Sequence, residues 1–228
     1  MAISENLAAV TERMRQAALR CGRNPGEIRL VAVSKTVSPE KIREAINAGV
    51  TILGENYIQE ARKKIEEIGG AIEWHFIGHL QSNKVKYAVD LFTMIHSVDS
   101  VSLAEELNRA AEKRNKIIPV LVQVNISGEE TKSGINPEET ARLLTELSSM
   151  DRLSVRGLMT MPPWFENAED ARPYFAALRN LRDELSHMNI KNITLRELSM
   201  GMSGDFEVAI EEGATLVRVG TALFGPRR

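Results

Sequence analysis

The stretch Leu30-Val-Ala-Val-Ser-Lys35-Thr36 is a short apolar run that ends in one long cationic side chain. Val, Ala and Val in succession are typical of a strand that is buried on both faces. Successive side chains of a strand point to opposite faces, so Lys35 shares a face with Val31 and Val33. A lysine at a strand end is usually solvated. If this one is desolvated instead, its pKa falls, and the neutral amine can attack an aldehyde to form a Schiff base.

The lysine strand is followed by a helix start, and this strand–helix unit repeats along the chain. Ser38 and Pro39 suit the N-cap and the first position of a helix, which Gly49 ends. Strands are expected at residues 30–36, 51–57, 73–80, 92–98, 119–126, 153–161, 193–199 and 215–223. Helices are expected at 39–48, 58–68, 82–89, 100–115, 137–150, 167–188 and 204–212, and an additional amphipathic helix at 3–21 precedes the first strand.

Eight strands alternating with helices predict an α/β fold, a single closed (β/α)8 TIM barrel with an extra N-terminal helix. No linker, low-complexity segment or charged tail interrupts the pattern, so we expect one domain across residues 1–228. An open doubly wound sheet is the alternative, but no glycine-rich dinucleotide fingerprint follows the first strand. Function gathers at the C-terminal ends of barrel strands. Polar residues stand there: Lys35, Asn56, His79, Ser97, Asp99, Asn125, Thr160, Ser199, Arg218 and Thr221.

Composition excludes several classes of partner. The 228 residues are 43% hydrophobic and 26% charged, which is ordinary for a soluble globular protein. A formal net charge of −2 gives no electrostatic case for binding nucleic acid or an anionic membrane. The start of the chain lacks the pattern of a signal peptide, and the apolar stretch 117–126 is too short to span a bilayer. A lone cysteine, Cys21, forms no internal disulfide. We therefore expect a cytoplasmic protein.

Two glycine-containing turns near the C-terminus suit a phosphate. Ser199-Met-Gly-Met-Ser203-Gly-Asp205-Phe206 reads as a strand-to-helix turn with Ser203 as the N-cap, and such a turn presents backbone N–H groups at the positive end of a helix. Asp205 weighs against an anion there. Gly220-Thr221 offers a second close approach of backbone and a hydroxyl donor, and barrel enzymes often bind phosphate after strands seven and eight. Two ordinary turns are the alternative interpretation.

A phosphate site beside a desolvated lysine indicates a phosphorylated aldehyde or ketone. Pyridoxal 5′-phosphate fits this description, and so does a sugar phosphate in a Schiff-base aldolase. Arg218 favours the first ligand, because it lies on the last strand, next to the lysine strand in a closed barrel. A permanent cation there could hydrogen-bond the pyridine nitrogen and keep that nitrogen unprotonated. Farther along, Trp164 and Phe165 follow the sixth strand, where they either pack on the next helix or contribute to a lid. His75 and His79 share a strand face without a third ligand nearby, so we expect no metal.

Several motifs together resemble one family. They are Val-Ala-Val-Ser-Lys35-Thr, Gly54-Glu-Asn56-Tyr, His75-Phe-Ile-Gly-His79-Leu-Gln-Ser-Asn83-Lys, the run 129–134, Gly157-Leu-Met-Thr-Met-Pro162 and Leu198-Ser-Met-Gly-Met-Ser203-Gly-Asp205-Phe. Read together, they are similar to the YggS/PROSC family, the pyridoxal phosphate homeostasis proteins, from about residue 29 to Gly225. The resemblance implies a barrel like the N-terminal domain of alanine racemase.

The resemblance also implies a set of cofactor-binding residues. Lys35 would hold pyridoxal 5′-phosphate covalently as an internal aldimine, and Arg218 would face the ring nitrogen. Ser203, Gly220 and Thr221 would hold the phosphate, while Ser199 and Met200 would lie close to the ring. Asn56 and His79 match family motifs at the barrel mouth.

The same resemblance predicts a carrier without established catalysis. Alanine racemases have a C-terminal β-domain, for which this sequence has no counterpart after Leu223-Phe-Gly225, and no tyrosine follows Lys35 where racemases place one. An arginine at the ring nitrogen also weakens the electron sink on which pyridoxal phosphate chemistry relies. We expect a monomer that buffers pyridoxal phosphate and related B6 vitamers and delivers the cofactor to apo-enzymes, with no nucleic acid or membrane partner. A vestigial racemase-like enzyme on the same cofactor and a Schiff-base aldolase are the alternatives.

Overall fold

The eight expected strands form one closed parallel barrel in sequence order, with β1 paired to both β2 and β8. The computed structural model describes residues 2–69, 72–129 and 132–226. The strands are β1 (Arg29–Val33), β2 (Ile52–Glu55), β3 (Glu73–Phe76), β4 (Met94–Val98), β5 (Ile118–Gln123), β6 (Leu153–Met159), β7 (Ile193–Ser199) and β8 (Leu216–Val219). The predicted TIM barrel is therefore confirmed, and an open doubly wound sheet was the wrong alternative.

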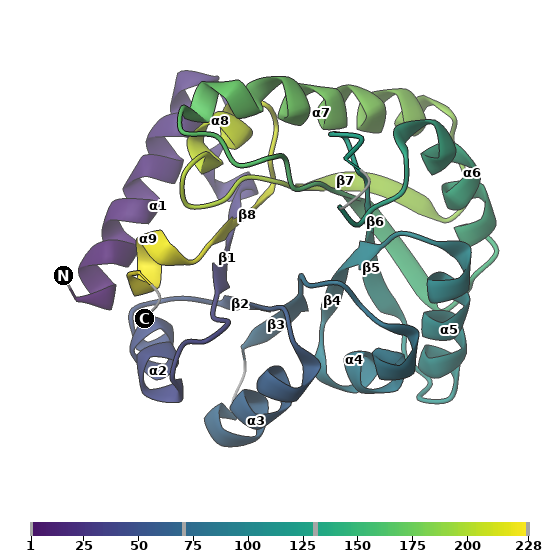
Figure 1. Cartoon of the computed structure of the whole chain (residues 1–228), viewed down its shortest axis with the longest axis horizontal. Coiled ribbons are helices and arrows are strands. Elements are labelled where there is room, and N and C mark those ends of the chain that lie inside the picture. The colour runs from purple at the N-terminus through teal and green to yellow at the C-terminus, as the bar shows by residue number, and fades with distance from the viewer. Residues whose placement is uncertain (1, 70–71, 130–131, 227–228) are drawn as a thin grey trace.

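Helices surround the barrel on its outer side (Figure 1). They are α1 (Ile3–Arg20), α2 (Pro39–Asn47), α3 (Ile58–Ile68), α4 (Val85–Leu91), α5 (Val101–Glu112), α6 (Pro137–Leu147), α7 (Arg172–His187), α8 (Phe206–Glu211) and α9 (Thr221–Phe224). The extra N-terminal helix α1 lies against α8 and α9, where Asn6 Nδ2 donates to the Leu223 carbonyl oxygen at 2.9 Å. No helix in the described ranges is long and apolar enough to cross a membrane.

Several boundaries differ from the sequence-based expectation, among them that of the first strand, which ends at Val33 and not at residue 36. The last strand ends at Val219, because the carbonyl oxygen of Gly220 accepts from the N–H groups of Leu223 and Phe224 and so begins α9. The long helix expected at 167–188 starts only at Arg172, because Pro173 has no N–H with which to continue a helix from residue 167. The helix expected at 204–212 starts at Phe206.

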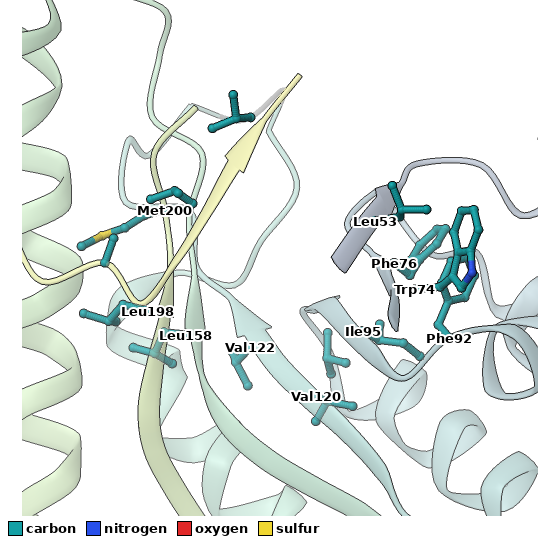
Figure 2. Packing of buried hydrophobic residues seen from close by; sticks show 14 of the residues in the cluster. Leu53, Trp74, Phe76, Phe92, Ile95, Val120, Val122, Leu158, Leu198 and Met200 are labelled. Atoms are coloured by element: carbon teal, nitrogen blue, oxygen red, sulfur yellow. The ribbon is translucent and has the colours of Figure 1, made fainter. Parts of the chain in front are cut away.

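Burial on both faces of the strands explains their apolar sequences. The interior of the barrel holds the cluster Val31, Val33, Ile52, Ile77, Met94, Leu121, Met159 and Leu216. A larger core fills the space between strands and helices, and Figure 2 shows part of it, including Trp74 and the Phe76 and Phe92 rings, whose centroids lie 5.1 Å apart. Each large side chain buried in this way contributes roughly 1.5–3 kcal/mol. The rigid double layer fixes where each strand ends, and hence where the residues at the barrel mouth lie.

Candidate functional site

A cavity of about 380 Å³ opens at the C-terminal ends of the strands, on one side of the barrel mouth. Six of the nine predicted cofactor-binding residues line it: Lys35, Asn56, Ser203, Arg218, Gly220 and Thr221. They come from the ends of β1, β2 and β8 and from the loop between β7 and α8, so a closed barrel is needed to bring them together. The apolar wall is made by Val33 and Ile77 and by the loop after β6.

Lys35 lies two residues beyond the end of β1 and lines the cavity. Val31 and Val33 both face the barrel interior, as the alternation of the strand predicted. The neighbouring Ser34 faces the opposite side, where its hydroxyl donates to Glu55 Oε1 at 2.7 Å. Lys35 is therefore carried to the mouth by the inward face of β1.

The buried Lys64 and the partly exposed Glu60 hold the backbone on both sides of Lys35. Lys64 Nζ, from α3, donates to the Ser34 carbonyl oxygen at 2.6 Å and to Glu60 Oε1 at 2.6 Å. The same Glu60 oxygen accepts from the Thr36 N–H at 2.5 Å. Thr36 has a φ of 62°, which is unusual for a β-branched residue and costs of order 1–3 kcal/mol. The Glu60 contact helps to stabilise this backbone conformation, and with it the direction in which Lys35 projects.

Replacing Glu60 with alanine is expected to destabilise the protein by about 1 kcal/mol, because one carboxylate serves both the Thr36 N–H and Lys64. Denaturant unfolding would measure the change. Glu66→Ala is the matched control: it removes an exposed partner of Arg62 on the same helix, and we expect a loss below about 0.5 kcal/mol. Equal losses for the two variants would show that Glu60 does not hold the backbone near Lys35.

Arg218 places a cation at the floor of the cavity. Its side chain is almost fully buried, with Nη1 donating to Ser199 Oγ at 2.7 Å and Nη2 to the Thr160 carbonyl oxygen at 2.9 Å. Burial lowers the pKa of Arg218 to about 10, and the nearby Asp205 opposes that shift. The guanidinium therefore stays charged at neutral pH, held by neutral oxygens and without an ion-pair partner in direct contact among the described residues.

The expected role of Ser203 as a helix N-cap was wrong. Asp205 is the N-cap residue of α8, and its Oδ1 accepts from the Met202 N–H at 2.6 Å, which closes the turn before the helix. Ser203 instead turns toward the end of β8, where its Oγ accepts from the N–H groups of Gly220 and Ala222 at 3.2 and 3.3 Å. This contact was not predictable from local sequence, because it joins residues seventeen and nineteen positions apart and depends on the pairing of β7 with β8.

Glycine is required at position 201 of the same loop. Gly201 has a φ of +89°, and a Cβ atom there would lie 2.5 Å from the Ala209 Cβ. The residue therefore permits both the left-handed backbone and the close approach of α8. Thr221, at the first position of α9, brings its hydroxyl to the same edge of the cavity. Hydroxyls and backbone N–H groups thus gather where the sequence placed a phosphate.

Three of the nine predicted site residues do not line the cavity. Ser199 is fully buried beneath it and contacts Arg218. Met200 is fully buried in the core between strands and helices. His79 lies beyond the end of β3, exposed, with Nδ1 3.5 Å from Ser133 Oγ. Of the run 129–134, residues 130 and 131 lie outside the described residues.

Asn56 carries an acceptor that points to a ligand. Its Oδ1 is buried and has no hydrogen-bond partner among the described residues, although the residue lines the cavity. A buried, unsatisfied acceptor costs about 1–3 kcal/mol unless a donor reaches it. The cavity wall therefore suits a ligand that carries a donor group near Asn56.

Two parts of the chain, the loop after β6 and the middle of β4, contribute to the site although their residues were not among the nine predicted cofactor-binding residues. Trp164, which is 83% exposed, lines the cavity from the loop after β6, and so does Phe165, which also packs on Tyr174 of α7 with ring centroids 5.6 Å apart. Phe165 therefore packs on the following helix, which was one of the two predicted roles, while the alternative role in a lid stays a prediction. The second is His96 in the middle of β4, which contacts Ser199. The sequence analysis sought site residues at the ends of strands, and His96 lies inside a strand. It nevertheless shares the inward face of β4 with Met94.

Comparison with known proteins gives a consistent family. A family model described as the alanine racemase N-terminal domain matches residues 5–228. A relative from Aquifex aeolicus named pyridoxal phosphate homeostasis protein is 51% identical over 225 residues, which cover 98% of each chain. A relative of the same name from Escherichia coli K12 is 42% identical, with 99% of this chain and 97% of the other covered.

Solved structures agree with that result. PipY from Synechococcus elongatus, described with pyridoxal phosphate bound, superposes with a TM-score of 0.85 at 39% identity, over 98% of this chain and 100% of the other. Alanine racemase from Clostridium difficile superposes with a TM-score of 0.75 at 16% identity, and 56% of its chain is covered. The second likeness shows a shared barrel fold alone.

Proposed function

Because the chain belongs to the alanine racemase N-terminal domain family and, within it, to the pyridoxal phosphate homeostasis proteins, we propose that it binds pyridoxal 5′-phosphate through a Schiff-base link to Lys35. Its role is to buffer the cofactor and related B6 vitamers in the cytoplasm, as a monomer, and to deliver the cofactor to apo-enzymes. The cofactor supplies an aldehyde for the lysine and a phosphate anchor. The protein residues supply the rest.

One observation carries the proposal: a lysine, a buried arginine and a cluster of hydroxyl and N–H donors line the same cavity. Lys35 supplies the amine, and Arg218 supplies a fixed donor for a ring nitrogen. Ser203, Gly220 and Thr221 supply donors for the phosphate. The unpaired acceptor of Asn56 suits a hydroxyl or iminium proton of the same ligand. A sugar phosphate would use the first and third features but has no ring nitrogen to face the arginine.

The electrostatics of the cavity support a carrier. A charged arginine at the ring nitrogen keeps that nitrogen unprotonated, so the ring is a poor electron sink. Besides Lys35 and Arg218, the titratable side chain that lines the cavity within the described ranges is Asp205. Burial raises the pKa of Asp205, and its carboxylate already accepts the Met202 N–H. A second acid or base poised for proton transfer is therefore not provided by these residues.

Absorbance spectroscopy of the purified protein tests the proposal. We expect added pyridoxal phosphate to give a visible absorption band that borohydride abolishes, together with a trapped mass increase that maps to the peptide containing Lys35. Incubation of the loaded protein with single amino acids should give no turnover. A protein that shows no trapped adduct at saturating cofactor would refute the binding function, and steady turnover of any amino acid would replace the carrier with an enzyme.

Replacing Ser203 with alanine is expected to weaken pyridoxal phosphate more than unphosphorylated pyridoxal. The Ser203 oxygen already accepts two N–H groups, so its own proton remains to be donated to an anion. Loss of one such donor costs ~1.5–3 kcal/mol at most, or about 10- to 100-fold in affinity. Thr221→Ala should act in the same direction. Titration with both ligands measures the difference.

Thr145→Ala is the matched control, because that hydroxyl lies on the exposed face of α6 and contacts only the Ala141 carbonyl oxygen among the described residues. Its affinities for both ligands should equal those of the parent. Equal losses for pyridoxal and pyridoxal phosphate in the Ser203 and Thr221 variants would move the phosphate site elsewhere.

A further inference from the structure

Four side chains form a continuous hydrogen-bonded chain inside the barrel, beneath the cavity. Arg218 Nη1 donates to Ser199 Oγ at 2.7 Å, and Ser199 Oγ lies 2.9 Å from His96 Nδ1. His96 Nε2 lies 3.0 Å from His75 Nδ1. The residues come from β8, β7, β4 and β3, so the chain crosses the barrel interior from one wall to the other. Its far end is near solvent, where His75 Nε2 lies 3.5 Å from Glu73 Oε2.

Burial favours the neutral form of both histidines. His75 is 1% exposed and His96 is fully buried. Burial lowers the pKa of His75 to about 3, with Arg29 acting in the same direction. Burial also lowers the pKa of His96 well below its ordinary value, and His75, Arg218 and Arg29 add to the effect.

Of the charged groups near this pair, Arg29 and Arg218 disfavour protonation, whereas the exposed Glu73 carboxylate favours protonation of His75 only weakly. Arg29 is paired with Glu197 at 2.7 Å, and Arg218 is the nearest cation to the Ser199 end. Glu73 is the carboxylate at the other end, and its side chain is 57% exposed. A proton on either histidine would therefore be placed in a buried site that already holds one cation.

The donors and acceptors along the chain fix the tautomers. Arg218 can only donate, so the Ser199 oxygen accepts, and its single proton is available for His96 Nδ1. A neutral His96 that accepts at Nδ1 must carry its proton on Nε2, which donates to His75 Nδ1. By the same rule His75 carries its proton on Nε2, directed at Glu73. The reverse assignment would direct a lone pair of His75 at a carboxylate and leave the Ser199 proton without an acceptor among these groups.

We propose that His96 and His75 are positioning residues for Arg218. As Nε2–H tautomers they direct the Ser199 proton toward His96, so that the Ser199 oxygen accepts from Arg218 and fixes the guanidinium at the cavity floor. Every donor in the chain points away from Arg218, so every acceptor lone pair points toward it. This alignment stabilises a buried cation that has no carboxylate in direct contact within the described part of the chain. The inference rests on the proposed function only in that Arg218 is the group meant to face the cofactor. The chain itself is a property of the protein alone.

Long-range ¹H–¹⁵N NMR of the histidine rings in the cofactor-free protein tests the inference first. The sequence contains four histidines, and the exposed His79 and His187 serve as internal controls. We expect His75 and His96 to show the neutral Nε2–H pattern and to remain neutral down to pH 5. An Nδ1–H tautomer for His96, or protonation of either buried histidine above pH 5, would overturn the proposal.

A second measurement uses variants and the loaded protein. His96→Leu removes the acceptor for Ser199, whereas His96→Gln offers an amide that can accept and donate in its place. We expect His96→Leu to shift the absorption band of the covalent adduct and to weaken pyridoxal phosphate by about tenfold, the effect of one buried hydrogen bond. His96→Gln should restore most of both properties, and His187→Leu should change neither.

The two failures are distinguishable. If the parent protein binds no pyridoxal phosphate, the proposed function fails, and the NMR tautomers still decide the positioning role. If the parent binds it and a folded His96→Leu protein keeps the same spectrum and affinity, the positioning role is refuted while the proposed function stands. If His96→Leu does not fold, the His96→Gln variant and the NMR result still decide.

Discussion

The Lys35→Ala protein is expected to lose the covalent adduct completely while keeping the barrel. Lys35 is the lysine that lines the cavity. Its backbone is held by contacts of Ser34 and Thr36 with Lys64 and Glu60, which do not involve the Lys35 side chain. Removing the amine therefore removes the nucleophile and leaves the fold. Any remaining pyridoxal phosphate should be held only by the phosphate and arginine contacts, and dialysis should remove it.

The measurement compares the visible band and the borohydride-trapped mass of the variant and the parent. Lys41→Ala is the matched control, because Lys41 is an exposed residue on the neighbouring helix α2, and this variant should trap the cofactor at the parental stoichiometry. Circular dichroism and thermal unfolding should be unchanged in both. A folded Lys35→Ala protein that still traps one cofactor per chain would show that the Schiff base forms at another lysine.

The alternation of β1 was enough to place Lys35, because a strand within a closed parallel barrel has only two faces and Val31 and Val33 identify the inner one. Repetition of strand and helix was enough to predict the barrel. Glycines at the turns and the order of the elements also predicted that Ser203, Gly220 and Thr221 lie together between the ends of β7 and β8, where a phosphate site stays a prediction. These features are local in the sequence, or repeat along it, and a single chain shows them directly.

Features that depend on distant pairing were not predictable in the same way. The sequence predicts Ser203 as a helix N-cap, but Asp205 is the N-cap residue of α8. The Ser203 hydroxyl instead accepts from the N–H groups of Gly220 and Ala222, seventeen and nineteen positions later. Likewise, nothing near His96 in sequence identifies it as a neighbour of Ser199, 103 positions away. Such contacts follow from the strand register around the barrel, which the sequence pattern does not specify to within one residue.

Thr36 illustrates a third case. Sequence patterns predict an extended lysine strand through residue 36, yet the strand ends at Val33 and Thr36 adopts a φ of 62°. Threonine disfavours this conformation, so intrinsic preference points the wrong way. The conformation depends on Glu60, on a different strand–helix unit. Strained backbone of this kind is common at functional sites and is visible only in the structure.

The Arg218→Glu protein is expected to acquire side reactions that the parent lacks. In the proposed complex of the parent, the charged guanidinium would lie near the ring nitrogen and keep that nitrogen unprotonated. A carboxylate at this position would favour a protonated pyridinium, the form that accepts carbanion charge. We expect the variant to bind pyridoxal phosphate, less tightly than the parent, and to convert it slowly to pyridoxamine phosphate in the presence of amino acids that the parent leaves untouched. Chromatography of the released cofactor measures this half-transamination.

The structural cost of the change is set by the partners of Arg218. A glutamate could accept the Ser199 proton only in competition with His96 Nδ1, and it would face the Thr160 carbonyl oxygen and lie near the Asp205 carboxylate, whose pKa is already raised by burial. We expect a loss of about 3–5 kcal/mol of stability, the range for breaking a buried charged network. Arg218→Gln is the matched control, since it removes the cation without adding an anion, and it should fold better and stay inactive.

The comparison of these two variants distinguishes two reasons for inactivity: an arginine that keeps the cofactor ring a poor electron sink, or the lack of a substrate site. Circular dichroism must first show that both are folded, and the bound cofactor must be quantified in each. If Arg218 suppresses reactions of the bound cofactor, half-transamination should appear in the glutamate variant and remain near background in the glutamine variant and the parent. A folded, loaded Arg218→Glu protein with no gain over the parent would mean that the ring nitrogen is not controlled from this position. If the parent is inactive, its inactivity would then require another cause, such as the scarcity of proton-transferring groups among the described residues of the cavity.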